Sequence, residues 1–259
     1  MNLFDYPFLN YAPNPAAAGC VAGIVFILLT SWFVQSIRKR FQPRRLSVLL
    51  FISQLAIFIE LIVRASIGDA AKNSRIVYTV LNSLFAIGQR MIIVSNYSFV
   101  LEVHHVRSCF SRGTFLGAVG GVLSSGFIMI PANIYAFNED QISTSFIFRK
   151  LSASILLLDT ILFYLILYLS KTIGDMKREG IILIFTSSIL CLIAAMFNLF
   201  QSISIDYYNK TNSNDFWFYG LQLSPIILAH FTWSILHPKR SLTDARLTKP
   251  ILFVNTENS

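Results

Sequence analysis

The sequence predicts an all-α, polytopic membrane protein with seven transmembrane helices, an outer N-terminus and a cytoplasmic C-terminus. Composition gives the first indication, because the 259 residues are 54% hydrophobic and 13% charged, with a mean hydropathy of +0.61. An ordinary soluble domain has about a quarter of its residues charged. Long apolar runs that alternate with short basic loops give the second indication. Backbone polar groups in lipid must be satisfied within their own segment, so spans of this length are helices.

Seven apolar runs are each long enough to cross about 30 Å of hydrocarbon as a helix. They lie at residues 16–37, 46–67, 76–101, 114–135, 146–170, 181–203 and 216–236. Residues 1–15 lack the basic start and the cleavage site of a signal peptide, so we expect them to persist as an outer tail. Residues 16–236 then form one membrane domain, and residues 237–259 form a cytoplasmic tail.

The first loop sets the predicted orientation. Residues 38–45 read RKRFQPRR, and Lys and Arg accumulate in short cytoplasmic loops. With this loop inside, the outer loops hold Lys72, Arg75 and Lys210, and Arg149 and Lys150 lie just inside the span 146–170. The net charge of +8 therefore reflects topology and anionic lipid headgroups rather than nucleic-acid binding. Asn209 begins an Asn-Lys-Thr glycosylation sequon in an outer loop, although the loop is short and an unmodified Asn209 fits equally well.

A stripe of small residues follows the predicted span 114–135. Gly113, Gly117, Gly121 and Ser125 recur at every fourth position and share one helix face. Small residues let membrane helices approach closely. We expect an internal helix–helix contact here, and a homodimer through Gly113, Gly117 and Gly121 is the alternative.

Polar residues inside the spans are costly in lipid, so they tend to face protein or a water-filled cavity. Asn82 and Gln89 share one face of the third span, with Arg90 beside it. At about 1.5 Å per residue, Arg90, Asp159 and His230 each lie about 20 Å from the outer ends of their spans. We therefore hypothesise that Arg90 and Asp159 pair inside the bundle, with His230 near them.

Glu60 and Arg64 are four residues apart on the second span, so they can meet on one helix face. One interpretation is a local pair that lowers the cost of insertion, with Arg64 extending toward the membrane surface. The other is a contribution to a substrate or proton path. His230 is the one histidine deep in a span, and no metal-ligand spacing or catalytic motif is present. We therefore expect no catalytic residues, no metal, no other cofactor and no enzymatic activity.

The two ends of the chain resemble the fungal lipid-translocating exporter family, which includes aminocholesterol-resistance proteins and a sphingoid long-chain-base exporter. The family starts with a Tyr-x-Pro motif. Its last helix has an acid and a Tyr at the outer end, then a Pro and a His-Pro-Gly-Arg exit. The positions that carry the resemblance are Tyr11, Pro13, Asp215, Tyr219, Pro225, His237, Pro238 and Arg240.

The middle of the chain departs from this family. Glu60 matches an acid of its second span, but Arg64 stands where the family has a Tyr. Asn198 and Gln201 replace an Arg and a Glu of its sixth span, and Gln222 replaces an acid after Tyr219. Hydrogen-bonding positions thus remain while their charges are lost, which argues against a proton-coupled mechanism.

The resemblance implies a lipid-stress resistance protein that moves an amphipathic lipid, such as a sphingoid base or a sterol-like molecule, across the plasma membrane or another secretory-pathway membrane. Membrane lipids would be its partners. A seven-helix receptor without transport is the alternative, although the short inner loops leave little surface for a cytoplasmic partner. The predicted headgroup path consists of Glu60, Asn82, Gln89, Arg90, Asp159, Gln222 and His230.

Overall fold

The structure is a computed structural model that describes residues 14–67, 74–104, 109–169, 176–212 and 216–236. Within these ranges the secondary structure is helical, with no strand. The elements in chain order are α1 (Pro15–Arg38), α2 (Arg44–Ser66), α3 (Arg75–His104), α4 (Cys109–Tyr135), the 3₁₀ turn η3 (Glu139–Gln141), α5 (Ile142–Leu169), α6 (Arg178–Gln201), α7 (Ile205–Asn212), η5 (Trp217–Leu223) and α8 (Ser224–Ile235).

Among the described residues, six helices, α1 to α6, are long and apolar enough to cross a membrane, and they coincide with the first six predicted spans. The chain is therefore a helical integral membrane protein. The seventh predicted span is helical from Phe216 to Ile235, but it begins as the π-helix η5. There the N–H of Ser224 binds the carbonyl of Tyr219, five residues back. Single-turn π segments of this kind occur frequently at functional sites.

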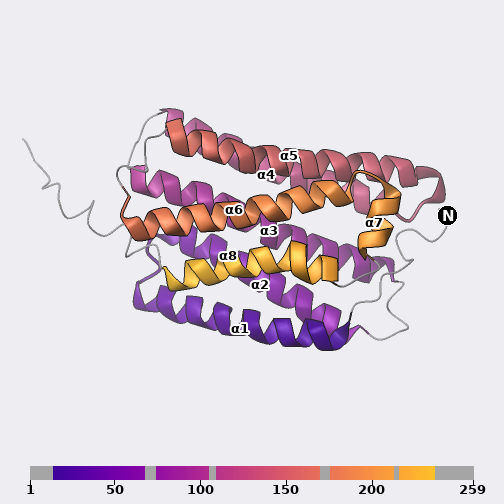
Figure 1. Ribbon diagram of the computed structural model, residues 1–259, viewed down its shortest axis with the longest axis horizontal. Coiled ribbons are helices and arrows are strands. Elements are labelled where there is room, and N and C mark those ends of the chain that lie inside the picture. The colour runs from indigo at the N-terminus through magenta and orange to yellow at the C-terminus, as the bar shows by residue number, and fades with distance from the viewer. Residues whose placement is uncertain (1–13, 68–73, 105–108, 170–175, 213–215, 237–259) are drawn as a thin grey trace, which may run out of the picture.

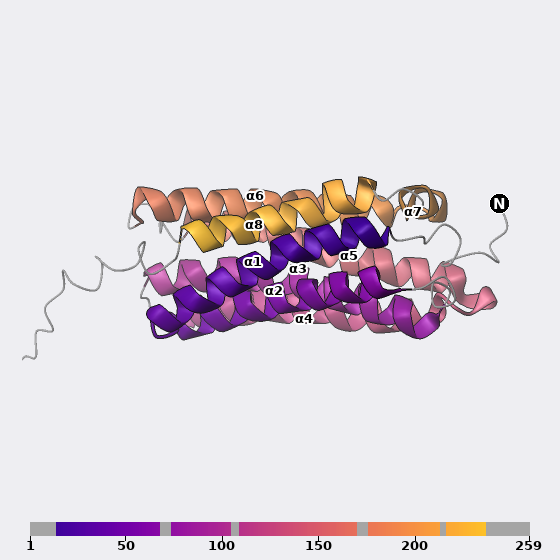
Figure 2. The same ribbon diagram turned by 90° about the horizontal axis from the view of Figure 1, so that it is seen from below.

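The long helices lie side by side along the longest axis and alternate in direction (Figures 1 and 2). The short helix α7 lies at one end of this bundle, which we call the α7 end. Helix α1 begins at that end. Its first residue is Pro15, which suits the first helical position, and the side chain of Asn14 caps it by accepting hydrogen bonds from the N–H groups of Ala16 and Ala17.

Helix α3 occupies the centre and contacts α2, α4, α5, α6 and α8. From Ile92 to Val100 every residue is buried, as expected for a helix surrounded by others. Phe99 packs edge-to-face on Trp233 of α8, with ring centroids 5.5 Å apart, and the indole N–H of Trp233 donates to Ser187 of α6. Large rings with a satisfied polar edge thus hold the half of the bundle opposite the α7 end.

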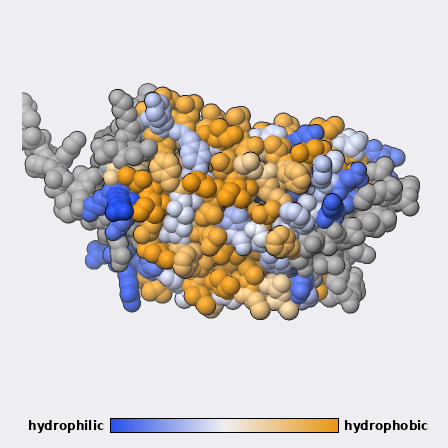
Figure 3. Space-filling model, viewed as in Figure 1, coloured by the Kyte–Doolittle hydropathy of each residue, from blue (hydrophilic) through white to orange (hydrophobic). Residues whose placement is uncertain are grey.

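The face of the molecule drawn in Figure 3 carries a wide apolar band, with hydrophilic residues gathered toward both ends. Large exposed apolar side chains such as Ile27, Leu116, Phe127 and Ile147 contribute to this surface. An apolar surface of this extent is far larger than a soluble monomer exposes. It is the surface that bilayer hydrocarbon covers.

Candidate functional site

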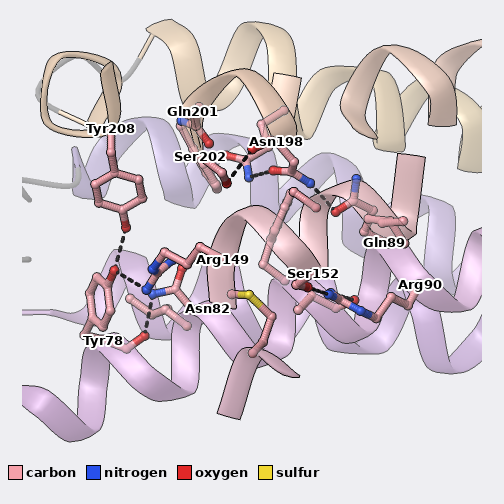
Figure 4. A pocket seen from close by; sticks show the side chains of 18 of the residues that line it. Tyr78, Asn82, Gln89, Arg90, Arg149, Ser152, Asn198, Gln201, Ser202 and Tyr208 are labelled. Atoms are coloured by element: carbon pink, nitrogen blue, oxygen red, sulfur yellow. Dashed lines mark hydrogen bonds between the residues drawn. The ribbon is translucent and has the colours of Figure 1, made fainter. Parts of the chain in front are cut away.

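A polar cavity of about 100 Å³ lies inside the bundle, in its half toward the α7 end. Side chains of α2, α3, α5, α6, α7 and η5 line it together with Met129 of α4 (Figure 4). Such a volume accommodates several water molecules or one small polar group, but no lipid tail. Of the predicted path residues, the structure brings Asn82, Gln89, Arg90 and Gln222 together in its wall.

Arg90 lies in the wall of this cavity, where its guanidinium forms four hydrogen bonds. Its Nε donates to Oγ of Ser125 at 2.9 Å, and Nη2 donates to Oγ of Ser152 at 2.9 Å. Further bonds reach the carbonyls of Ser125 and Ala86, each at 3.2 Å. All four acceptors are neutral, and no described carboxylate forms an ion pair with Arg90. The site thus keeps a buried guanidinium, 7% exposed, whose charge is balanced only by dipoles.

The predicted pairing of Arg90 with Asp159 and His230 is wrong. Arg90 reaches α5 at Ser152, and Asp159 lies two turns further along that helix, about 10 Å away. There the Tyr97 hydroxyl donates to the Asp159 carbonyl at 2.6 Å. His230 lies within 3.0 Å of the Ser53 hydroxyl on α2. The predicted depths were counted from the ends of the apolar runs, and these ends were imprecise. Helix α5 begins at Ile142, four residues before the predicted span.

Arg149 is a second guanidinium in the cavity wall, on α5 one turn before Ser152. Its Nη2 donates to the Tyr78 hydroxyl at 2.8 Å and to Oδ1 of Asn133 at 3.0 Å. The Tyr78 hydroxyl also contacts that of Tyr208 on α7, so these side chains tie α7 to the bundle (Figure 4). From the sequence, Arg149 was placed at the outer end of its span, and this role was not predicted.

Arg64 is the third arginine of the cavity. Its Nε and Nη2 donate to Oε1 of Glu60 at 2.8 and 2.6 Å, which confirms the predicted contact between these residues. The expected extension of Arg64 toward the membrane surface is wrong, because its guanidinium turns inward over the Phe218 ring at 3.9 Å. Glu60 is fully buried and is not part of the cavity wall.

Three side-chain amides form a chain across one wall. Gln222 of η5 donates to Oδ1 of Asn198 on α6, and Asn198 donates to Oε1 of Gln89 on α3, each at 2.6 Å. The Nε2 of Gln89 is buried without a hydrogen-bond partner among the described residues. The neutral positions noted at Asn198 and Gln222 thus connect three helices beside the cavity.

Replacing Asn198 with Leu should break this chain and leave amides of Gln89 and Gln222 unsatisfied. Interhelical hydrogen bonds in membranes contribute about 0.6 kcal/mol on average and up to about 1.7. We therefore expect a modest loss, about 1–2 kcal/mol, measured as the unfolding midpoint in detergent. Asn138→Leu, at an exposed loop position, is the control. Equal losses in the two variants would contradict the role of the chain.

An apolar groove of about 320 Å³ lies between α3 and α4, next to the cavity. Ala86, Arg90 and Met129 line both spaces. The groove opens on the lipid-facing surface, where Leu123 is 48% and Phe127 67% exposed. A polar interior space and an apolar side opening therefore adjoin at one buried arginine.

The small-residue stripe on α4 has two kinds of environment. A Cβ on Gly121 would lie 2.5 Å from both carboxylate oxygens of Asp159, so Gly121 lies in the expected internal contact, against α5. A Cβ on Gly113 or Gly117 would meet no atom within 4 Å. Gly121 therefore contributes to packing within the chain, and the predicted homodimer surface would be reduced to the other two glycines.

Several predicted positions do not join the site. The sequon residue Asn209 is only 5% exposed on α7, so the folded chain shields it. Tyr219 and Pro225 lie in η5 and α8. The remaining positions of the family resemblance fall outside the described residues, and these are Tyr11, Pro13, Asp215, His237, Pro238 and Arg240.

Fold and site define a helical integral membrane protein with an arginine-lined interior cavity. Within the described ranges, no group of three or more His, Cys, Asp or Glu residues is placed to hold a metal ion. Comparison with protein families, with curated proteins and with solved structures finds no match to this chain. The site itself is therefore the basis for assigning function.

Proposed function

We propose that this protein moves an amphipathic lipid between the two leaflets of a membrane. The headgroup occupies the polar cavity while the tail stays in the groove between α3 and α4, in contact with bilayer hydrocarbon. One observation carries the proposal: the polar cavity and the lipid-facing apolar groove share Ala86, Arg90 and Met129. A headgroup crossing bare hydrocarbon leaves its hydrogen bonds unsatisfied, whereas the cavity wall offers donors and acceptors at that depth.

We also propose how the chain crosses the membrane and to which family it is related. The helix from Phe216 to Ile235 is the seventh span, and the α7 end faces outward, because the basic loop at residues 38–45 lies at the opposite end. We further propose that the chain is a divergent relative of the fungal lipid-translocating exporters, in the plasma membrane or another secretory-pathway membrane. Tags at the two termini, probed in intact cells, should report opposite compartments. Tags in the same compartment would exclude an odd number of spans.

Reconstitution into vesicles tests transport directly. The protein should accelerate leaflet exchange of a tail-labelled fluorescent lipid, measured by quenching of the outer leaflet. Gly126→Leu should abolish the acceleration, because a Cβ at this position already contacts Cδ and Nε of Arg90 at 3.6 Å, so the longer side chain fills the junction of cavity and groove. Gly120→Leu, on the same helix with nothing within 4 Å of its Cβ, should leave exchange unchanged. Saturable lipid binding without exchange would instead favour the receptor.

A further inference from the structure

We propose that the lipid handled by this site has an anionic headgroup, such as a phosphate monoester, which binds at Arg90 with Arg149 and Arg64 around it. This inference deepens the transport proposal and rests on it for the identity of the occupant as a lipid. It replaces the cationic sphingoid base that the family resemblance implies. The reasons lie in the charge of the cavity, in the state of Arg90 and in the adjoining groove.

The cavity wall is cationic. Among the described residues, three arginines and no carboxylate line it. Glu60 balances Arg64 from behind the wall, and Arg90 forms hydrogen bonds to neutral oxygens alone. A protonated amine entering this space would meet like charges at short range, which opposes its binding. An anion would meet planar, multidentate donors that suit phosphate and carboxylate oxygens.

The buried positive charge of Arg90 is energetically unfavourable without a counter-charge. A charged side chain deep in a membrane protein generally pairs with an opposite charge or marks a pathway, and an uncompensated buried charge destabilises a fold. Gln89 also lines the cavity, and its Nε2 is a hydrogen-bond donor without a partner among the described residues. A bound anion would supply both a counter-charge to Arg90 and an acceptor beside Gln89.

The groove identifies the anion as part of a lipid. A free phosphate would need only the cavity, whereas here an apolar groove between α3 and α4 has Arg90 in its lining and exposed apolar side chains at the bilayer surface. Its walls contain Ile87, Met91, Leu123, Phe127 and Ile130, which suit an acyl chain. The two volumes fit this assignment, because the cavity offers about 100 Å³ to the polar group and the groove about 320 Å³ to the tail.

The test compares two probes that differ only in the headgroup: tail-labelled sphingosine, a cation, and tail-labelled sphingosine 1-phosphate, an anion. Binding to the purified full-length protein is measured by fluorescence anisotropy in uncharged detergent, and leaflet exchange is measured in neutral vesicles. The phosphate should tighten binding by about tenfold or more, which corresponds to about 1.4 kcal/mol. Arg90→Gln should remove most of this difference, and Arg90→Lys should retain part of it.

Lys150→Gln is the matched control, because Lys150 is an exposed cation on α5 next to Arg149 but outside the cavity. It should leave discrimination between the probes unchanged. Should Arg90→Gln fail to fold, as judged by its unfolding midpoint, Arg149→Gln applies the same test. Equal loss of discrimination in Lys150→Gln would indicate surface attraction and overturn the site.

The outcomes separate this inference from the transport proposal. Equal or tighter binding of sphingosine overturns the anionic headgroup, whether or not lipids exchange. Preferential binding of sphingosine 1-phosphate without exchange supports the headgroup and overturns transport. Inorganic phosphate serves as the probe without a tail. If inorganic phosphate binds as tightly as sphingosine 1-phosphate and displaces it, the tail contributes nothing, and the proposal that the occupant is a lipid is overturned.

Discussion

Glu60→Leu is expected to lower the free energy of unfolding by about 3–5 kcal/mol, the usual cost of leaving one partner of a buried ion pair behind. Glu60 is fully buried and accepts two hydrogen bonds from Arg64. The guanidinium of Arg64 in turn lies over the Phe218 ring, so it cannot turn toward water without disturbing the contact between α2 and η5. The loss should appear as a lower unfolding midpoint in detergent.

The double variant Glu60→Leu with Arg64→Met should recover most of this stability, since a buried ion pair replaced by apolar residues of similar size is often neutral. Glu179→Leu provides a control, because Glu179 is exposed at the start of α6 and should change stability by less than about 0.5 kcal/mol. If single and double variants lose the same amount, the two residues contribute independently and the pair does not explain their burial.

Gly121→Ala is expected to be the most damaging small substitution on α4. Its Cβ would lie 2.5 Å from both carboxylate oxygens of Asp159, so α4 and α5 must separate or Asp159 must change rotamer. Overpacking of this kind costs typically about 1–3 kcal/mol. Gly120→Ala is a matched control one residue earlier, because its Cβ meets no atom within 4 Å.

A second substitution, at Asp159 on α5, should relieve the clash. Asp159→Ala removes the atoms that the new methyl group meets, so Gly121→Ala with Asp159→Ala should be more stable than the sum of the two single effects. The difference is read from unfolding midpoints of the four proteins of the cycle. Strict additivity would show that the two positions are not in contact, and the packing of α4 on α5 described above would then be wrong.

Hydropathy predicted the first six membrane helices well because a span is defined by the length of its apolar run, which the sequence displays directly. It also found Gln89, Arg90 and Gln222, since polar residues within such runs are conspicuous. The partner of Arg90 was predicted wrongly because pairing depends on the relative height and rotation of separate helices. A shift of two turns replaced Asp159 with Ser152 as the α5 contact.

Arg149 was missed although a signal for it exists. Ser145, Arg149 and Ser152 recur at spacings of four and three, so they form one polar face at the start of α5. In the structure all three are buried and bonded to α3 or α4. Arg149 lies just inside the outer end of the predicted span, so it was counted among the charges of that side. No single-helix pattern could indicate the contact with Tyr78, because it joins residues 71 positions apart.

The open side of the α3–α4 groove has a consequence for selectivity. Since Leu123 and Phe127 are exposed at this groove, the far end of a tail bound as proposed would continue into surrounding lipid instead of ending against a protein wall. Under the proposed function, recognition would then depend on the headgroup and the first few methylenes. Substrates that share a headgroup but differ in acyl-chain length or unsaturation should compete on nearly equal terms, unlike ligands enclosed in a sealed pocket.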